Sequence, residues 1–354
     1  MRKAGSPDTY KYAAAAGVSV LPGTVRAGII WYLPYFLAEH GIDAGEVLRA
    51  VGLPRSAFDS QDNLIEYKQL EGVLSETARR TGVADVALQL GRHTRLQNFG
   101  VAGRAALCAP TAGAGLKKFT ELFNLHSTAS VVTIITDGEF ARLVYAIVEL
   151  GMTETHHLQY GAAIISSNLL RDVFGPQWRP VAITCACRAP ANPRGMQRCF
   201  DAPLHFDCAE TAVLFETHWL DQPLPPVEPR LLAEMAAAVQ RSREAILADF
   251  PVAIRRIVRR QVLLGEFSMT DVASLVSMHR RTLDRHLQQH GLRYGELVES
   301  IKADLARQLL RDTQMPIQQV AESVKFSSAA NFATAFRRWS GMTPSEYRRR
   351  CAPG

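Results

Sequence analysis

Residues 271–297 read DVASLVSMHRRTLDRHLQQHGLRYGEL, and residues 319–347 read QVAESVKFSSAANFATAFRRWSGMTPSEY. The two stretches repeat one pattern of hydrophobic and glycine positions. The offset grows from 48 residues at the start of the pattern to 50 residues at Gly291 and Gly341. Each increase needs only one extra residue in a turn. A repeat of a short helix, a tight turn and a second helix predicts two helix-turn-helix units.

Positive charge is concentrated in the repeated region. The chain has 354 residues and a net charge of +6. Residues 252–354 hold 17 Lys and Arg against 9 Asp and Glu, a net of +8, whereas the remaining residues carry a net of −2. A basic module of this kind is expected to bind the phosphates of double-stranded DNA. A solvated basic face with no partner is the alternative interpretation.

The region before the repeat, residues 24–222, is expected to be an α+β sensory or regulatory domain. Apolar residues spaced by three or four predict helices at 42–51, 67–81, 85–90 and 116–125. Valine- and isoleucine-rich segments at 129–136 and 140–148, joined by Asp137-Gly138, predict a β-hairpin. The pattern then predicts a helix at 153–174, a strand at 180–187 and short strands near Leu204 and Val213.

Two further segments complete the expected organisation. Residues 1–23 are expected to be a flexible tail, and residues 223–251 a linker that begins with four prolines in eight positions. Within this linker, residues 231–247 predict a helix with an apolar stripe, which either forms a dimer contact or packs on its own domain. The DNA-binding domain is expected to span residues 252–350, so the chain reads as a sensory domain followed by an all-α domain.

Cysteine usage and hydropathy point to a reduced, cytoplasmic chain. The six cysteines form no C-x-x-C pair and show no zinc-ligand spacing, so neither a metal nor another cofactor is expected. No run of 18 apolar residues is present, and we expect no association with a membrane.

The first unit has a predicted reading helix from about Arg280 to His290. Met269-Thr270-Asp271 predicts the start of the supporting helix, with Thr270 as its cap. Leu283 and Leu287 lie four residues apart and are expected to face the core.

The remaining polar residues of that helix are the candidates for contacts with DNA. Arg281, Asp284 and Arg285 share a different face and are predicted to read bases, because arginine pairs with guanine and aspartate accepts from cytosine. Arg280 and Arg293 are predicted to contact phosphates.

The repeated region resembles the AraC/XylS family of bacterial transcription regulators. The resemblance is carried by the Val-Ala-x-x-Val-x-Met pattern, by residues 281–287 and above all by the closing segment from Phe332 to Arg348. It implies two helix-turn-helix units joined by a long helix at 295–312, about 27 Å in length. Such a helix would set the reading helices in successive major grooves, about 34 Å apart.

The sequence departs from the family pattern in three places. Family members usually carry glycine in each turn, where this chain has Ser277 and Lys325, and His279 replaces a capping serine. The base-facing positions of the second reading helix are small: Ala329, Ala330, Ala333 and Thr334. Small side chains contact thymine methyl groups but cannot form bidentate hydrogen bonds. The first unit is therefore expected to supply most sequence specificity, with Lys325, Arg337 and Arg338 on phosphates in the second.

Residues 24–224 resemble the arabinose-binding-type N-terminal domain of one AraC subgroup. The resemblance is carried by residues 99–103, 175–180, 200–206 and 219–225. It implies a small-molecule effector, but it does not imply that the effector is a sugar, because similar proteins respond to quite different small molecules. Arg104 and His126 lie in apolar stretches and are the candidates for contacting an effector. A structural role for each is the alternative, as is an interaction surface with no ligand.

The resemblance implies an effector-responsive activator that recruits RNA polymerase. The apolar stripe at 231–247 leaves a homodimer as a further possibility. A ligand-independent repressor and a protein-interaction module with weak DNA binding are the alternatives. An enzyme with a DNA-binding tail is disfavoured, because the sequence has no G-x-S-x-G, G-x-G-x-x-G, P-loop or H-E-x-x-H motif.

Overall fold

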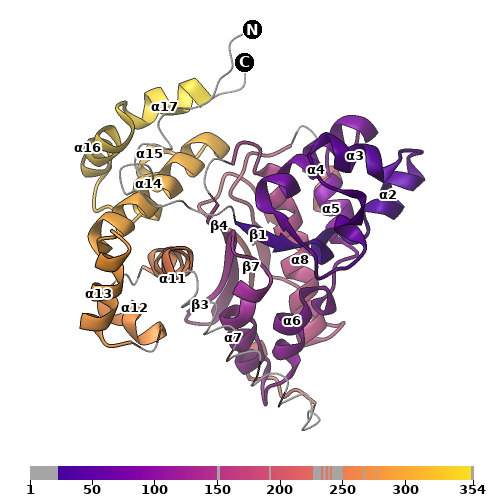
Figure 1. Cartoon of the computed structure of the whole chain (residues 1–354), viewed down its shortest axis with the longest axis horizontal. Coiled ribbons are helices and arrows are strands. Elements are labelled where there is room, and N and C mark those ends of the chain that lie inside the picture. The colour runs from indigo at the N-terminus through magenta and orange to yellow at the C-terminus, as the bar shows by residue number, and fades with distance from the viewer. Residues whose placement is uncertain are drawn as a thin grey trace. The chain divides into compact units, whose positions relative to one another are not determined.

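The computed structural model describes residues 23–149, 152–190, 193–225, 250–265, 268–276 and 278–351, with single helical positions at 233, 237 and 240. The chain divides into two compact units, residues 22–244 and a second unit that includes residues 245–354. Each can be followed by colour in Figure 1. The predicted tail at 1–23, apart from Gly23, and most of the predicted linker helix at 231–247 lie outside the described residues.

A five-stranded sheet organises the first unit, in the order β3-β4-β7-β5-β6. The predicted hairpin is confirmed: β3 (Ser130–Asp137) pairs antiparallel with β4 (Phe140–Ile147). The turn between them contains Gly138, whose φ of 59° favours glycine. The remaining strands are β7 (Thr211–Glu216), β5 (Ala182–Thr184) and β6 (Leu204–His205), of which only β5 and β6 run parallel.

Helix α8 (His156–Phe174) is the central helix of this unit, with 15 of its 19 residues buried. It contacts both α5 (Val86–Gly91) and β7. A side chain at Gly91 would place its Cβ 2.6 Å from Ile164, so glycine permits the close approach of α5 to α8. The amide of Asn168 reinforces this contact by donating to the Gly91 carbonyl across 3.0 Å.

Further helices surround this core. The α-helices are α2 (Leu33–Glu39), α3 (Ala44–Ala50), α4 (Tyr67–Thr81), α6 (Gly100–Leu107), α7 (Ala112–Leu122) and α9 (Pro193–Gln197). The 3-10 helices are η1 (Ala27–Ile30), η2 (Arg55–Phe58), η3 (Leu96–Phe99), η4 (Phe123–Leu125) and η5 (Thr217–Asp221). The helix predicted at 67–81 is confirmed with the same bounds.

One element of this unit was not predicted. Strands β1 (Thr24–Arg26) and β2 (Leu64–Glu66) form a separate antiparallel pair within a region that the sequence predicts as helical. Each strand has three residues, too few for a period-2 pattern to be visible, and the pairing partner lies 40 residues away in the sequence. The predicted strand at 180–187 is also shorter than expected, since β5 covers only Ala182–Thr184.

The second unit is all-α. Its helices are α11 (Phe250–Leu264), α12 (Met269–Leu275), α13 (Arg280–Gln289), α14 (Tyr294–Asp312), α15 (Ile317–Ser323), α16 (Ala329–Ser340) and α17 (Pro344–Cys351). The predicted long helix is confirmed as α14, whose 19 residues extend about 28 Å. The predicted cap at Thr270 is wrong. The amide of Asp271 donates to Ser268 Oγ across 3.1 Å, and this earlier hydroxyl caps α12.

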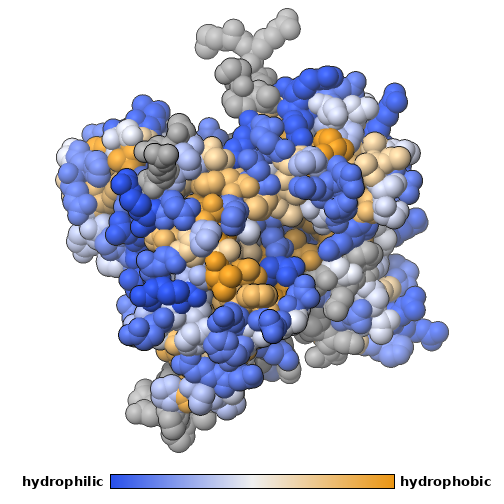
Figure 2. Space-filling view, turned by 180° about the vertical axis from the view of Figure 1, so that it is seen from behind, coloured by the Kyte–Doolittle hydropathy of each residue, from blue (hydrophilic) through white to orange (hydrophobic). Residues whose placement is uncertain are grey.

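The exterior is largely hydrophilic on the face shown in Figure 2, where hydrophobic residues occupy smaller areas. Within the described residues, no helix combines the length and hydrophobicity needed to cross a lipid bilayer.

Candidate nucleic-acid interface and sensory cavity

Helix α13 is strongly amphipathic, and its buried and exposed faces match those predicted for the first helix-turn-helix unit. Leu283 and Leu287 are fully buried. Arg281, Asp284 and Arg285 are exposed on the outer side. The imidazole of His279 caps the helix, because its Nδ1 accepts the amide of Arg281 across 3.3 Å. The non-standard cap therefore still satisfies one of the free amides at the helix start.

The charged groups near α13 differ in how they are engaged. Among the described residues, Arg281 and Arg285 have no ion-pair partner. Asp284 accepts from Gln288 Nε2 across 3.1 Å, one turn along the same helix. Arg280 is exposed, and Arg293 lies 3.6 Å from Glu296 in an exposed pair. Two arginines of the outer face are thus available to an anion or a base edge.

Aromatic residues anchor the second helix-turn-helix unit. Phe332 and Phe336 are fully buried, and Trp339 is nearly so. Ser328 caps α16 by accepting the amide of Asn331 across 3.2 Å. Lys325, in the turn, has a φ of 61°, the left-handed conformation for which glycine is usual. Ser277, in the first turn, lies outside the described residues.

The outer face of α16 carries few groups that can form hydrogen bonds. Ala330 and Thr334 are exposed, while Ala329 and Ala333 are half-buried. The Thr334 hydroxyl donates to the Ala330 carbonyl across 3.1 Å, so it is already bonded within its own helix. This face therefore offers a base edge mainly methyl groups.

Asn331 is a candidate that the sequence reasoning missed. It is exposed in the first turn of α16, and its Nδ2 lies 3.3 Å from Ser327 Oγ. An asparagine amide can pair with adenine in bidentate fashion. The signal available in the sequence was a polar side chain that directly follows Ala330, one of the positions predicted to face the bases.

The two arginines after this face have different surroundings. Arg338 Nη2 lies 2.7 Å from Glu299 Oε1, which joins α16 to α14. Arg337 is also exposed, on the last turn of α16. On the inner side, Arg307 of α14 lies 3.0 Å from Asp304 and donates to the Trp339 carbonyl across 3.1 Å. These contacts hold α16 against the linking helix.

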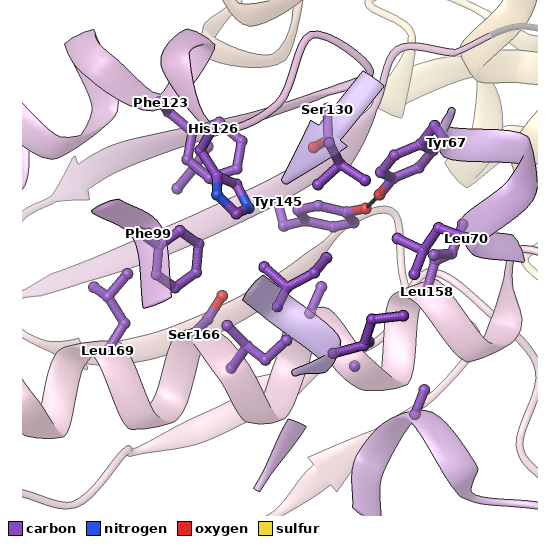
Figure 3. Close-up of a pocket in the computed structure, with 18 of the residues that line it drawn as sticks. Tyr67, Leu70, Phe99, Phe123, His126, Ser130, Tyr145, Leu158, Ser166 and Leu169 are labelled. Carbon is purple, nitrogen blue, oxygen red and sulfur yellow. Dashed lines mark hydrogen bonds between the residues drawn. The ribbon is translucent and has the colours of Figure 1, made fainter. Parts of the chain in front are cut away.

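A cavity lies inside the N-terminal compact unit, residues 22–244, between α8 and strands β3 and β4 (Figure 3). It contains about 690 Å³ of space free of protein atoms, a volume that includes open solvent at its mouth. Most of the lining is aliphatic or aromatic. The polar lining residues are Tyr67, His126, Ser130, Tyr145, His157 and Ser166.

His126 is buried and lies between two aromatic rings. Its ring centroid is 4.5 Å from that of Phe99 and 5.4 Å from that of Phe123. Burial lowers its pKa to about 3, with a further contribution from the charge of Arg26, so the imidazole is neutral at pH 7. Its Nδ1 has no hydrogen-bond partner among the described residues. His126 also lines the cavity, and a buried nitrogen without a partner is a candidate to bind a ligand there.

Besides Ser130 and Ser166, two tyrosines contribute labelled polar groups in Figure 3. The hydroxyls of Tyr67 and Tyr145 are hydrogen-bonded to each other, as the dashed line in Figure 3 marks. Burial raises the pKa of Tyr67 to about 12, so this phenol remains neutral.

The two effector candidates from the sequence lie in different environments. His126 lines the cavity, whereas Arg104 is exposed on α6 and does not. Within the described part of the chain, no group of three His, Cys, Asp or Glu residues is arranged to hold a metal ion.

Comparison with known families accounts for both units. Residues 41–224 match the family described as the arabinose-binding domain of AraC transcription regulator, N-terminal. Residues 272–350 match a helix-turn-helix domain family. The first match alone covers more than half of the chain.

Similar proteins are bacterial regulators. The ornithine utilization regulator of Pseudomonas aeruginosa is 24% identical, over 88% of this chain and 92% of its own length. The transcriptional regulator VirS of Mycobacterium tuberculosis is 23% identical, over 93% of this chain and 97% of its own. The crystal structure of the transcriptional regulator CdpR from P. aeruginosa aligns with 90% of this chain and 96% of its own, with a TM-score of 0.43 and 23% identity.

Proposed function

The chain belongs to the AraC family of DNA-binding transcription regulators, and we propose that it is an effector-responsive activator whose first helix-turn-helix unit dominates base reading. The observation that carries this proposal is the contrast between the outer faces of α13 and α16. The first presents Arg281, Asp284 and Arg285, and the second presents Ala330 and Thr334.

Unequal reading follows from the hydrogen-bonding capacity of these side chains. Arg281 and Arg285 can each pair with guanine, and a good bidentate pair is worth about 1–3 kcal/mol of discrimination. Ala329, Ala330 and Ala333 have no polar side-chain atom to offer. We infer that α16 chiefly positions the protein on DNA, with Arg280, Arg293, Lys325, Arg337 and Arg338 contacting phosphates.

Response to an effector is supported by the cavity of the first unit. A pocket with an apolar lining and a few polar groups is the usual form of a small-molecule site. One relative is named for ornithine utilization. Ornithine carries ammonium and carboxylate groups, and within the described part of the chain no charged residue lines this cavity to pair with them. We therefore propose a different effector for this chain.

Family membership also supports RNA polymerase as a partner and a homodimer as the active form, both of which we include in the proposal. A ligand-independent repressor would bind the same DNA. The two hypotheses differ in whether an added compound changes transcription. We assign no catalytic reaction to the chain.

The proposal is tested by selecting binding sites from random DNA with the full-length chain at two salt concentrations. We expect a motif of about 20 base pairs, from two half-sites one helical turn apart, with one well-defined half and one degenerate half. Binding should weaken steeply as salt increases. Two equally sharp halves would contradict unequal reading, and salt-sensitive binding without any enriched motif would contradict sequence-specific regulation by the chain alone.

A further inference from the structure

We propose that the cavity between α8 and the β3–β4 hairpin binds an uncharged, largely apolar molecule with one hydroxyl or carbonyl group, which pairs with Nδ1 of His126. This inference deepens the proposed function, since it rests on an effector acting through the first unit. It assigns a chemical class and an anchoring atom to that effector.

The residues that line the cavity carry no charge at pH 7. Among the residues that the structure describes, no aspartate, glutamate, lysine or arginine lines the cavity. Its two histidines are neutral at pH 7, because burial lowers the pKa of His126 to about 3 and that of His157 to about 4. An ionised group placed here would lose its hydration and gain no counter-ion, which strongly disfavours binding.

Arg26 and Glu71 directly follow the lining residues Val25 and Leu70 in the sequence, but both side chains bind other groups of the protein. Arg26 pairs with Asp62 across 2.7 Å, and its Nε donates to the Leu125 carbonyl across 2.8 Å. Glu71 accepts the amides of Thr153 and Glu154 through Oε1, at 2.8 and 2.6 Å. Neither Arg26 nor Glu71 lines the cavity, so neither offers its charge to a ligand there.

The apolar lining determines that the rest of the ligand is apolar. Four phenylalanine and leucine residues from separate elements, Phe99, Phe119, Leu143 and Leu169, face this space together with further aliphatic residues. Contact with such a lining favours a hydrocarbon or aromatic body, because binding removes the apolar surface of both partners from water.

The polar anchor is His126. Its side chain is 2% exposed, and Nδ1 has no hydrogen-bond partner among the described residues. Figure 3 shows the ring directed into the cavity between Phe99, Phe123 and Tyr145. The hydroxyls of Tyr67 and Tyr145 are bonded to each other, and the Ser130 hydroxyl lies 2.9 Å from Ser127 Oγ, whereas the imidazole keeps an open position. A ligand hydroxyl fits either tautomer, since it both donates and accepts.

A matched series of eight-carbon probes tests the charge assignment on the unaltered full-length chain. Calorimetry compares 1-octanol with octanoate and octylammonium at pH 7.5, and 2-phenylethanol provides a neutral probe of different shape. We expect saturable binding of at least one alcohol, with both ionised probes bound at least about tenfold more weakly. Equal or tighter binding of either ion, or binding of neither alcohol, would overturn the proposal.

Variants then locate the site. His126→Phe keeps an aromatic ring but removes Nδ1, and we expect it to weaken alcohol binding about five- to tenfold, the value of one hydrogen bond. The same change at exposed His218 is the matched control and should have no effect. Ala162→Leu fills the cavity from α8 and should abolish binding. Unchanged affinity in His126→Phe or Ala162→Leu would place the alcohol elsewhere and refute the assignment.

The same samples separate this inference from the proposed function. Binding of the full-length chain to a selected DNA site is measured alongside the probes. Loss of DNA recognition with intact alcohol binding would overturn the proposed function alone. Intact DNA recognition without alcohol binding would overturn the inference alone.

Discussion

Arg338 on α16 and Glu299 on α14 form an ion pair, with Nη2 2.7 Å from Oε1. Both side chains are largely exposed, at 62% and 55%. The pair therefore joins the second reading helix to the linking helix at the surface, where a phosphate would compete with the carboxylate for the same guanidinium.

We expect Glu299→Gln to strengthen DNA binding about threefold, because it releases Arg338 from an exposed pair worth roughly 0–1 kcal/mol. Titration of a labelled selected site at low salt measures the effect. Glu322→Gln is the matched control, since it removes the same charge from an exposed position on α15 that forms no pair with Arg338. An equal gain in both variants would mean that net charge alone, rather than Arg338, determines the change.

Arg285→Ala and Arg281→Ala should each weaken binding to the selected site by about 1–3 kcal/mol and relax the base preference at one position of the well-defined half. The physical reason is the loss of a bidentate partner for guanine. Arg49→Ala, at an exposed position on α3 of the N-terminal unit, changes the net charge equally and serves as control. Repeated site selection provides the measurement, and an unaltered motif for Arg285→Ala would remove that residue from the reading face.

The helix-turn-helix units were predictable because local spacing encodes them. Leu283 and Leu287 lie one turn apart, as do Phe332 and Phe336, and all four are fully buried. The cavity could not be predicted in the same way. Its lining residues come from segments between Val25 and Leu169, each of which reads as ordinary core in isolation.

The long-range contacts of the first unit explain that difference. Tyr67 and Tyr145 are 78 residues apart, and nothing in either segment indicates that their hydroxyls meet. His126 drew attention in the sequence only as a polar residue within an apolar stretch. The tertiary arrangement adds that its Nδ1 is left without a partner at a cavity.

Thr334→Arg should sharpen the degenerate half of the binding motif. Thr334 is exposed on α16, and its hydroxyl is bonded to the Ala330 carbonyl, so the native residue contributes little to base recognition. Arginine there can reach a guanine and should add about 1–3 kcal/mol of discrimination at one position. Thr334→Met has similar reach without donors and is the control. A motif that stays degenerate with arginine would place this face away from the bases.

Lys325→Gly should raise the free energy of unfolding by roughly 0.5–1 kcal/mol, because glycine adopts a φ of 61° without the strain of a side chain. Lys325→Ala retains the strain and is the matched control for the lost charge. If Lys325 contacts a phosphate, both variants should weaken DNA binding equally and reduce its salt dependence by about one ion. Urea denaturation and salt titration measure the two effects separately, and equal stability of the two variants would contradict the strain argument.

The buried imidazole of His126 should make the stability of the protein depend on pH. Its pKa is about 3 in the folded chain against about 6.5 when exposed, so the unfolded chain binds the proton more readily. Its contribution to stability is therefore complete above pH 6.5 and is lost as the pH falls, by about 1.4 kcal/mol at pH 5.5. His126→Phe cannot be protonated, so its free energy of unfolding relative to the unaltered chain should rise by that amount between pH 7.5 and 5.5. Leu169→Ala, in the same cavity, is the control and should be destabilised by a similar amount at both pH values. If the unaltered chain and His126→Phe show the same pH dependence, this imidazole is protonated in the folded state and the prediction is wrong.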